Sequence, residues 1–351
     1  MHVPDGFIDA PTSAVAGVVA AGAVAVSLRG ARKELDERTA PLAGLVAAFI
    51  FAVQMLNFPV AAGTSGHLLG GALAAILVGP YTGVLCISVV LLMQGVLFAD
   101  GGLTALGVNI TNMSVIGVVV AYAVFRALVK VAPRRPGSVT AASFVAALVS
   151  VPAAALAFVG FYAIGGTTDV PLGTVAAAMG GVHVLIGIGE AVITALTVGA
   201  VIAVRPDLVY GARDLRQPLK LRVGGELVDA PAAAPEPVAA PRASRRTLLL
   251  SGLAVSLVLA GFVSFYASAS PDGLERVAED KGFADSAEEH ANADSPLADY
   301  GVRDVDDARL SGGLAGVIGV GATVVAGGAV FWAVRRRRAD DTAPASTGGD
   351  A

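Results

Sequence analysis

Long apolar segments separated by short polar connections run along most of the chain, and this pattern predicts membrane-spanning helices. A helix needs about 20 mostly apolar residues to cross a ~30 Å hydrocarbon core. Residues 67–128 are too long for one span, and we divide them at Gly79-Pro80-Tyr81 and at the polar stretch 99–109, because proline ends or kinks a helix. The pattern predicts nine spans, of which the third is so short that a re-entrant segment is an alternative: 7–28, 40–62, 65–79, 81–99, 109–128, 139–163, 173–204, 247–268 and 311–334.

The composition agrees with a membrane protein. Of the 351 residues, 55% are hydrophobic and 15% are charged, whereas soluble domains carry about 25% charged residues. A water-soluble protein and a disordered chain are therefore excluded. An outer-membrane β-barrel is disfavoured because the apolar runs are long rather than alternating. We expect an all-α, polytopic transmembrane helical bundle in the cell membrane, with the lipid bilayer around it and no nucleic-acid partner.

The basic residues are sorted along the chain. Twenty of the 24 lysines and arginines fall in five clusters: 29–38, 126–135, 205–222, 242–246 and 335–338. With nine spans and the N-terminus outside the cell, all five clusters lie on the cytoplasmic side, as the positive-inside rule requires. A single span over 65–99 would break this sorting, so the charges support the division at Pro80. The predicted topology places the N-terminus outside and the C-terminus in the cytoplasm.

The chain is predicted to contain two membrane modules. Residues 1–205 hold seven spans, and residues 206–244 form a cytoplasmic loop and a Pro/Ala-rich linker. Residues 245–338 hold two further spans around an acidic extracytoplasmic loop, 269–310, in which four basic and twelve acidic residues give a net charge of −8. Residues 339–351 are expected to be a disordered tail.

Two histidines are predicted to meet at the outer membrane face. His2 precedes the first span, and His67 lies at the outer end of the third. A histidine at position 2 lets three nitrogens chelate one ion, namely the Met1 amine, the His2 backbone nitrogen and the His2 ring, and the His67 ring would complete a square. Four nitrogens in a plane suit Ni(II) or Cu(II), and low-spin Co(II) accepts them, whereas zinc prefers a tetrahedron. The alternative is an exposed His2 and a core His67 with a local partner, and the residues alone leave both open.

This site needs a chain that begins at Met1. A cleavable signal peptide is not expected, because residues 1–10 carry Asp5 and Asp9 but no lysine or arginine. We also expect the initiator methionine to be retained, because His2 is bulky.

Other polar residues are candidates for holding the metal ligands in place. Around His67, glycines allow close backbone approach, and Ser65 can cap the helix that follows. His183 and Glu190 share one face of the seventh span, where ionisable groups are functional candidates, although a packing pair that satisfies itself is the alternative. The candidate partners are Asn57, Ser65, Asp100, Asn109, Asn112, His183 and Glu190.

Two further function classes are compatible with these residues. An intramembrane enzyme would use His183 and Glu190 as an acid–base pair, and a membrane scaffold would bind a partner through its acidic ectodomain. The sequence contains no G-x-x-x-x-G-K-[ST] motif with which the chain would energise itself by ATP, and no H-E-x-x-H motif of a metalloprotease.

Four motifs in order resemble the CbiM/NikM family, the substrate-capture subunits of energy-coupling-factor transporters for nickel or cobalt. They are MHVPDGF at the N-terminus, NFPVAAGTSGHLLGG, FADGGLTALGVNITNM and HVLIGIGEA. The resemblance covers about residues 1–205. PDGLERVAEDKGF, which begins at Pro271, resembles the PDGLE domain, a small two-span partner that is here fused to the C-terminus through the linker.

The resemblance implies that the chain is a transporter subunit and not an enzyme. It implies that a transported Ni2+ or Co2+ ion is held by the Met1 amine, the His2 amide and ring, and the His67 ring, with no prosthetic group. It further implies a partner transmembrane scaffold subunit and cytoplasmic ATPase subunits. The opening HVPDG resembles that of the nickel branch more than that of the cobalt branch, but the motifs do not separate the two metals.

Overall fold

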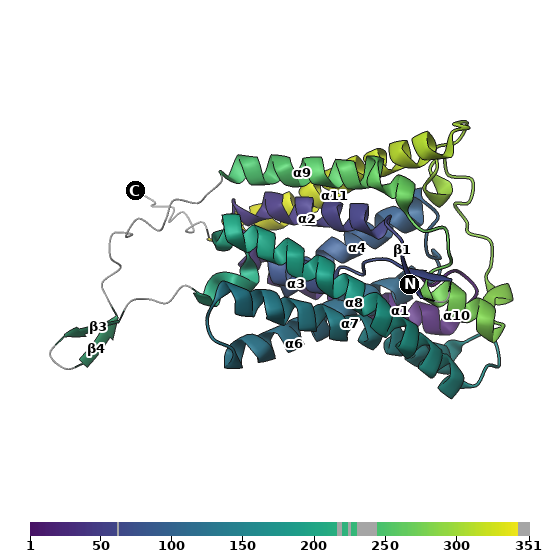
Figure 1. Cartoon of the computed structure of the whole chain (residues 1–351), viewed down its shortest axis with the longest axis horizontal. Coiled ribbons are helices and arrows are strands. Elements are labelled where there is room, and N and C mark those ends of the chain that lie inside the picture. The colour runs from purple at the N-terminus through teal and green to yellow at the C-terminus, as the bar shows by residue number, and fades with distance from the viewer. Residues whose placement is uncertain (62, 216–219, 224–225, 230–243, 343–351) are drawn as a thin grey trace, which may run out of the picture.

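The computed structural model describes residues 1–61, 63–215, 220–223, 226–229 and 244–342, most of which form helices lying side by side in a bundle (Figure 1). In these described residues, seven helical segments are long and apolar enough to cross a membrane: Ala10–Glu34 (α1), Pro80–Leu97 (α4), Leu106–Val131 (α5 to α6), Pro136–Gly165 (α7), Leu172–Val204 (α8), Arg245–Tyr266 (α9 and a 3-10 turn) and Ala308–Arg337 (within α11). The predicted all-α, polytopic membrane fold is confirmed.

Shorter elements connect these helices. Their bounds are Thr39–Gln54 (α2), Phe58–Ala61 (β1), Thr64–Gly66 (β2), Gly71–Val78 (α3), Pro206–Leu208 (η2), Tyr210–Leu215 (η3), Lys220–Val223 (β3), Glu226–Asp229 (β4), Gly273–Lys281 (α10), Ala284–Ser286 (η5) and Ala298–Tyr300 (η6). The α5 to α6 segment consists of Leu106–Asn109, a π-helical turn over Ile110–Ile116 (η1) and Gly117–Val131, and α9 proper covers Arg245–Gly261, followed by Val263–Tyr266 (η4). Both strand pairs are antiparallel hairpins.

The linker and tail predictions fall largely outside the described residues. Within 206–244 the structure describes the 3-10 turns, the hairpin of β3 and β4, and residue 244. The last helix, α11, covers Ala308–Thr342, so it enters the predicted tail by four residues. Residues 230–243 and 343–351 lie outside the described part of the chain.

The prediction of a helical third span over residues 65–79 is wrong for the first residues of that range. Residues 64–66 form strand β2, which pairs with β1, and the helix begins only at Gly71. Helix α3 has eight residues, and at 1.5 Å per residue it is about 12 Å long, too short to cross the membrane alone. The predicted break is confirmed, because Gly79 has φ +102° and Pro80 is the first residue of α4. The apolar pattern could not separate a buried loop from a helix.

The break at Gly79 lies beside the far end of α1. The Glu34 carboxylate accepts hydrogen bonds from the Thr82 amide (2.7 Å), the Thr82 hydroxyl (2.8 Å) and the Tyr81 amide (3.3 Å). It therefore satisfies amides at the start of α4 that have no partner within the helix.

The basic clusters meet at one end of the bundle. The Arg245 guanidinium donates to the Glu37 carbonyl (3.0 Å), and Arg335 lies 3.5 Å from the Glu37 carboxylate. Arg126 and Gly211 line a common cavity, so the basic cluster 126–135 lies beside the cluster 205–222 at this end. In Figure 1 the first residues of α9 and the hairpin of β3 and β4 lie on the left, whereas the N-terminus and α10 lie on the right. The two ends of the bundle therefore differ in charge.

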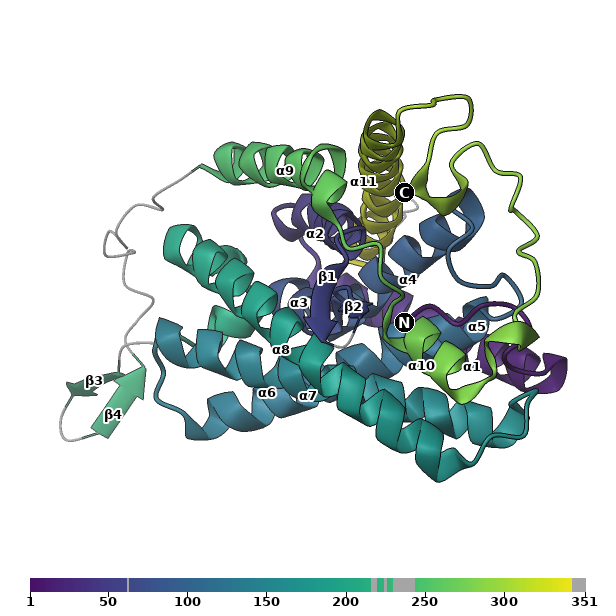
Figure 2. The ribbon, with the colours of Figure 1, turned by 45° about the vertical axis from the view of Figure 1, so that its right-hand side comes forward.

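The C-terminal helices α9 and α11 pack against each other and against α2 (Figure 2). The backbones of α2 and α11 approach closely, because a Cβ atom on Gly44 would lie 3.3 Å from the amide nitrogen of Gly328. Farther along, Gly319 faces the rings of Phe51 and Phe98. Small residues permit such close helix contact in a membrane. The two modules therefore share one packed core.

A leucine at this contact tests how tightly the modules are joined. We expect Gly44→Leu to lower the free energy of unfolding by about 1–3 kcal/mol, the usual cost of overpacking. Thermal unfolding in detergent measures it. Gly22→Leu on α1 is the control, because no heavy atom lies within 4 Å of a Cβ there. Equal stability of the two variants would contradict the packing described.

Candidate metal centre

The N-terminal segment is buried in the end of the bundle. Met1 is 2% exposed and Val3 is completely buried. The Val3 amide donates to the Asn109 side-chain oxygen (2.8 Å), and the Asn109 side-chain nitrogen donates back to the Val3 carbonyl (3.0 Å). The Asp5 carboxylate accepts hydrogen bonds from the Thr104 amide (2.8 Å) and hydroxyl (2.5 Å). These contacts of the residues that follow His2 hold the N-terminal segment in place.

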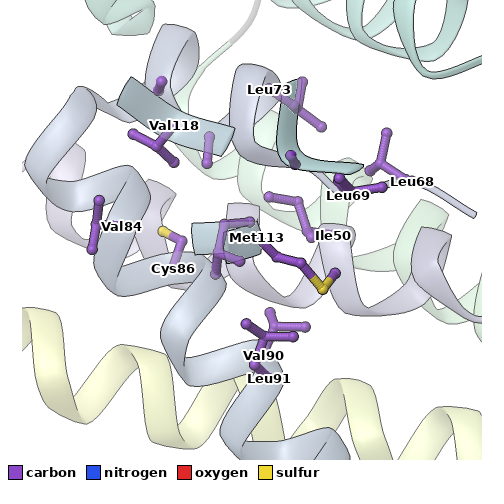
Figure 3. Close-up of a cluster of buried hydrophobic side chains, with 14 of the residues drawn as sticks. Ile50, Leu68, Leu69, Leu73, Val84, Cys86, Val90, Leu91, Met113 and Val118 are labelled. Carbon is purple, nitrogen blue, oxygen red and sulfur yellow. The ribbon is translucent and has the colours of Figure 1, made fainter. Parts of the chain in front are cut away.

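Helix α8 holds the loop that carries His67 through the side chain of Glu190. Glu190 accepts hydrogen bonds from the amides of Leu69 (2.6 Å) and Gly70 (3.1 Å). Gly70 adopts φ +84°, a conformation that favours glycine. Leu68 and Leu69 lie in a cluster of buried apolar side chains (Figure 3). Glu190 therefore shapes the loop rather than facing the site directly.

The His67 ring presents one nitrogen to the N-terminus. Its Nδ1 lies 3.0 Å from the Leu68 carbonyl, so Nδ1 carries the proton and Nε2 has a free lone pair. The Met1 nitrogen lies 2.5 Å from Nε2. Adjacent nitrogen ligands in a square plane with ~2.0 Å bonds are about 2.8 Å apart. The two groups thus already stand close to the spacing of neighbouring metal ligands.

The His2 ring lies next to the same pair. The rings of His2 and His67 are stacked, with centroids 5.1 Å apart and planes inclined by 10°. Both nitrogens of His2 have other partners, since Nδ1 lies 3.1 Å from Asp100 Oδ1 and Nε2 lies 3.1 Å from Gln94 Oε1. Met1, His2 and His67 are therefore brought together, and chelation through the Nδ1 atom of His2 requires it to leave Asp100.

Two carboxylates face these nitrogens. Asp272, at the start of α10, lies 2.6 Å from the Met1 nitrogen and 3.4 Å from His67 Nε2. Burial alone would raise the pKa of Asp272, but the Met1 ammonium holds that pKa well below its usual range. Asp100 behaves similarly, because the His2 ring and the Tyr300 hydroxyl lower its pKa against the effect of burial. Both carboxylates therefore carry negative charge beside the predicted ligands.

The remaining predicted partners divide into those near the centre and those away from it. Asn109 holds the backbone beside His2, and the Asn57 carbonyl accepts a hydrogen bond from the Ser268 amide (2.7 Å). Asn112 is completely buried, and no hydrogen-bond partner for its side-chain amide is found in the described part of the chain. Asn112 lies in the π-helical turn η1.

The predicted capping role of Ser65 is wrong. Gly70 precedes α3 and provides no side-chain cap. Ser65 instead bonds to the C-terminal module: its hydroxyl donates to the Ser270 carbonyl (2.7 Å), and its amide donates to the Pro271 carbonyl (2.9 Å). The sequence suggested a cap because serine commonly fills that position, whereas the β-hairpin places Ser65 six residues before the helix.

His183 and Glu190 do not form the acid–base pair of the enzyme hypothesis. His183 Nδ1 bonds to the Met179 carbonyl at 2.8 Å, and Glu190 is engaged by the His67 loop. His183 Nε2 has no hydrogen-bond partner among the described residues. The ring packs near Gly273 of α10. The two side chains serve different contacts.

Asp272 and Gln94 are the residues of this centre that were not predicted. Asp272 begins a capping box, because its side chain accepts the Glu275 amide while Glu275 accepts the Asp272 amide. That pattern signals only a helix start. Within the described residues, no group of three His, Cys, Asp or Glu side chains suited to a metal is found. The predicted four-nitrogen set differs from such a cluster, because two of its nitrogens, the Met1 amine and the His2 amide, belong to the main chain.

A cavity of about 620 Å³ opens beside the centre. It lies between the two modules, and its lining includes His2, His67, Asp100, Asp272 and Glu275. The candidate ligands thus border a cavity large enough for many water molecules rather than a closed core.

Comparison with known proteins identifies the two parts of the chain. Residues 2–208 match the CbiM family model, described as a cobalt uptake substrate-specific transmembrane region, and residues 246–336 match the PDGLE domain. The cobalt transport protein CbiM of Sorangium cellulosum is 34% identical over 218 residues, which is 60% of this chain and 94% of that protein. The fused nickel transport protein NikMN of Rhodobacter capsulatus is 44% identical over 125 residues, which is 36% of each chain.

A solved structure has the same fold. The crystal structure of a truncated transition metal transporter is 31% identical, with a TM-score of 0.51, and the likeness covers 58% of this chain and 99% of that one. The chain therefore belongs to the CbiM/NikM family of metal-transport membrane proteins, with a PDGLE domain fused to its C-terminus, and is a transporter rather than an enzyme.

Proposed function

We propose that this protein captures Ni2+ or Co2+ outside the cell as the substrate-specific subunit of an ATP-driven energy-coupling-factor importer. The observation that carries the proposal is the buried Met1 nitrogen, 2.5 Å from His67 Nε2 and next to the stacked His2 ring. Two relatives, a fused nickel transport protein and a cobalt transport protein, support the choice of metals.

The proposed site binds the ion through four nitrogens in a plane. The Met1 amine, the His2 backbone nitrogen and the His2 ring form two fused chelate rings, and His67 Nε2 fills the fourth position. The Met1 ammonium and the His2 backbone amide must each lose one proton to solvent before their nitrogens can bind, as metal ligands generally must. The Leu68 carbonyl keeps the His67 tautomer that leaves Nε2 free. Such a planar set favours nickel or low-spin cobalt over zinc.

The orientation and the partners follow from the charges and the sequence. The basic clusters gather at the end of the bundle away from the metal centre, and the positive-inside rule assigns that end to the cytoplasm. The centre then faces outward, with the N-terminus outside and the C-terminus in the cytoplasm. Because the sequence has no ATP-binding P-loop motif, we assign energy coupling to separate scaffold and ATPase subunits.

Adding one residue before Met1 tests the proposed ligands. The extension moves the free amine out of the chelate, so we expect the protein to lose bound nickel, as His67→Ala also should. Metal analysis of purified, nickel-loaded protein measures the metal-to-protein ratio. One residue added after Ala351 is the matched control, with binding retained. Full binding by the N-terminally extended protein would refute the site.

Glu190→Gln tests whether α8 positions His67. The glutamine replaces one accepting oxygen with an NH2 group that faces a backbone amide, so the loop must shift. We expect nickel affinity to fall about 10- to 100-fold, as for other residues that orient metal ligands. Titration calorimetry compares it with Glu279→Gln, an exposed acid on α10. Equal affinities would mean that the loop positions His67 without Glu190.

Uptake by whole cells tests the proposed coupling. Cells that produce this chain together with energy-coupling-factor scaffold and ATPase subunits should accumulate radioactive nickel or cobalt. A P-loop lysine substitution in the ATPase should abolish accumulation while the purified chain still binds metal. Accumulation that persists with the inactive ATPase would exclude an ATP-driven importer.

A further inference from the structure

The C-terminal module reaches into the metal centre at a fixed position. Its turn before α10 is bonded to the hairpin of the first module through Ser65, and the Ser268 amide donates to the Asn57 carbonyl (2.7 Å). Leu274 is 1% exposed, and Gly273 leaves no room for a Cβ atom beside the His183 ring. The position of Asp272 is therefore set by both modules.

The two oxygens of Asp272 have separate roles. Oδ1 accepts the amides of Leu274 (2.8 Å) and Glu275 (2.9 Å) and so caps α10. Oδ2 points the other way, 2.6 Å from the Met1 nitrogen and 3.4 Å from His67 Nε2. One oxygen is thus occupied by the helix, and the other faces two of the proposed metal ligands.

The distances from Oδ2 match an axial position above the proposed plane. With metal–nitrogen and metal–oxygen bonds of ~2.0–2.2 Å, an axial oxygen lies about 3 Å from each nitrogen in the plane. The observed 2.6 and 3.4 Å lie on either side of this value. Oxygen and nitrogen ligands together in a tetragonal arrangement suit Ni(II).

The charge of Asp272 is also matched to a cation. The carboxylate is buried, and the Met1 ammonium it contacts is almost inaccessible to solvent. A buried charge is costly unless it is paired. When the ion replaces the ammonium proton, the carboxylate keeps a positive partner in the same place.

We propose that Asp272 supplies a fifth, axial oxygen ligand to the transported ion, so that the two fused modules build one metal site. This inference rests on the proposed function, because it assumes that the ion is held by Met1, His2 and His67. The PDGLE domain then contributes directly to metal capture. On loading, Oδ2 exchanges its hydrogen bond from the amine for a bond to the metal, and Oδ1 continues to cap α10.

Asp272→Asn isolates the axial ligand from the cap. Asparagine caps helices as well as aspartate does, so its side-chain oxygen can keep the bonds to Leu274 and Glu275 while the charged oxygen is lost. The control is Asp280→Asn, which removes the same charge from the exposed side of α10, where Asp280 pairs with Arg276 at 3.2 Å. The full-length proteins are titrated with Ni2+, and X-ray absorption at the nickel edge counts the ligands in the wild type.

We expect five nitrogen and oxygen ligands in the wild type, an affinity at least tenfold lower in Asp272→Asn, and no change in Asp280→Asn. A wild-type site with four ligands, or an affinity of Asp272→Asn equal to or tighter than that of the wild type, would overturn the inference. If the wild type bound no nickel or cobalt, or bound it equally well after His67→Ala, the proposed function itself would fail. These two failures are therefore distinguishable.

Discussion

The buried N-terminal amine is the constraint on which the end of the bundle that holds α10 depends. An ammonium with almost no exposure needs a negative partner and hydrogen-bond acceptors, and Asp272 and His67 provide them at 2.6 and 2.5 Å. Meeting that need brings residues from the first and last thirds of the chain to one point. The hydrogen bonds between Asn109 and Val3 then keep the terminus from withdrawing.

The same constraint links the two modules. The turn before α10 must lie against the β-hairpin to deliver Asp272, and α9 and α11 must pack against α2 to support that turn. Glu190, on α8, also holds the loop that follows His67 in place. A carboxylate within a membrane helix is tolerated here because two backbone amides that would otherwise lack partners bond to it.

The sequence predicted the helical membrane fold and the break at Pro80, because hydropathy and proline are local signals. It also predicted that His2 and His67 lie close together, and their rings are stacked, whereas their role as metal ligands remains a prediction. It did not predict that residues 64–70 form a strand and a buried loop, since such a loop is as apolar as a helix. Asp272 was missed because its partners lie about 200 or more residues away and only its capping pattern is visible in the sequence. The role of Ser65 was misjudged for the same reason: its partner belongs to the other module.

We propose that this metal-transport protein recognises its cargo with its own N-terminus. Its central claim concerns one place in the bundle, between the Met1 nitrogen and His67 Nε2. The most direct measurement is a crystal structure of the nickel-loaded protein with anomalous scattering recorded at the nickel edge. The account predicts one strong peak about 2 Å from both nitrogens. A peak at His183 or His290, with the space between Met1 and His67 empty, would contradict it.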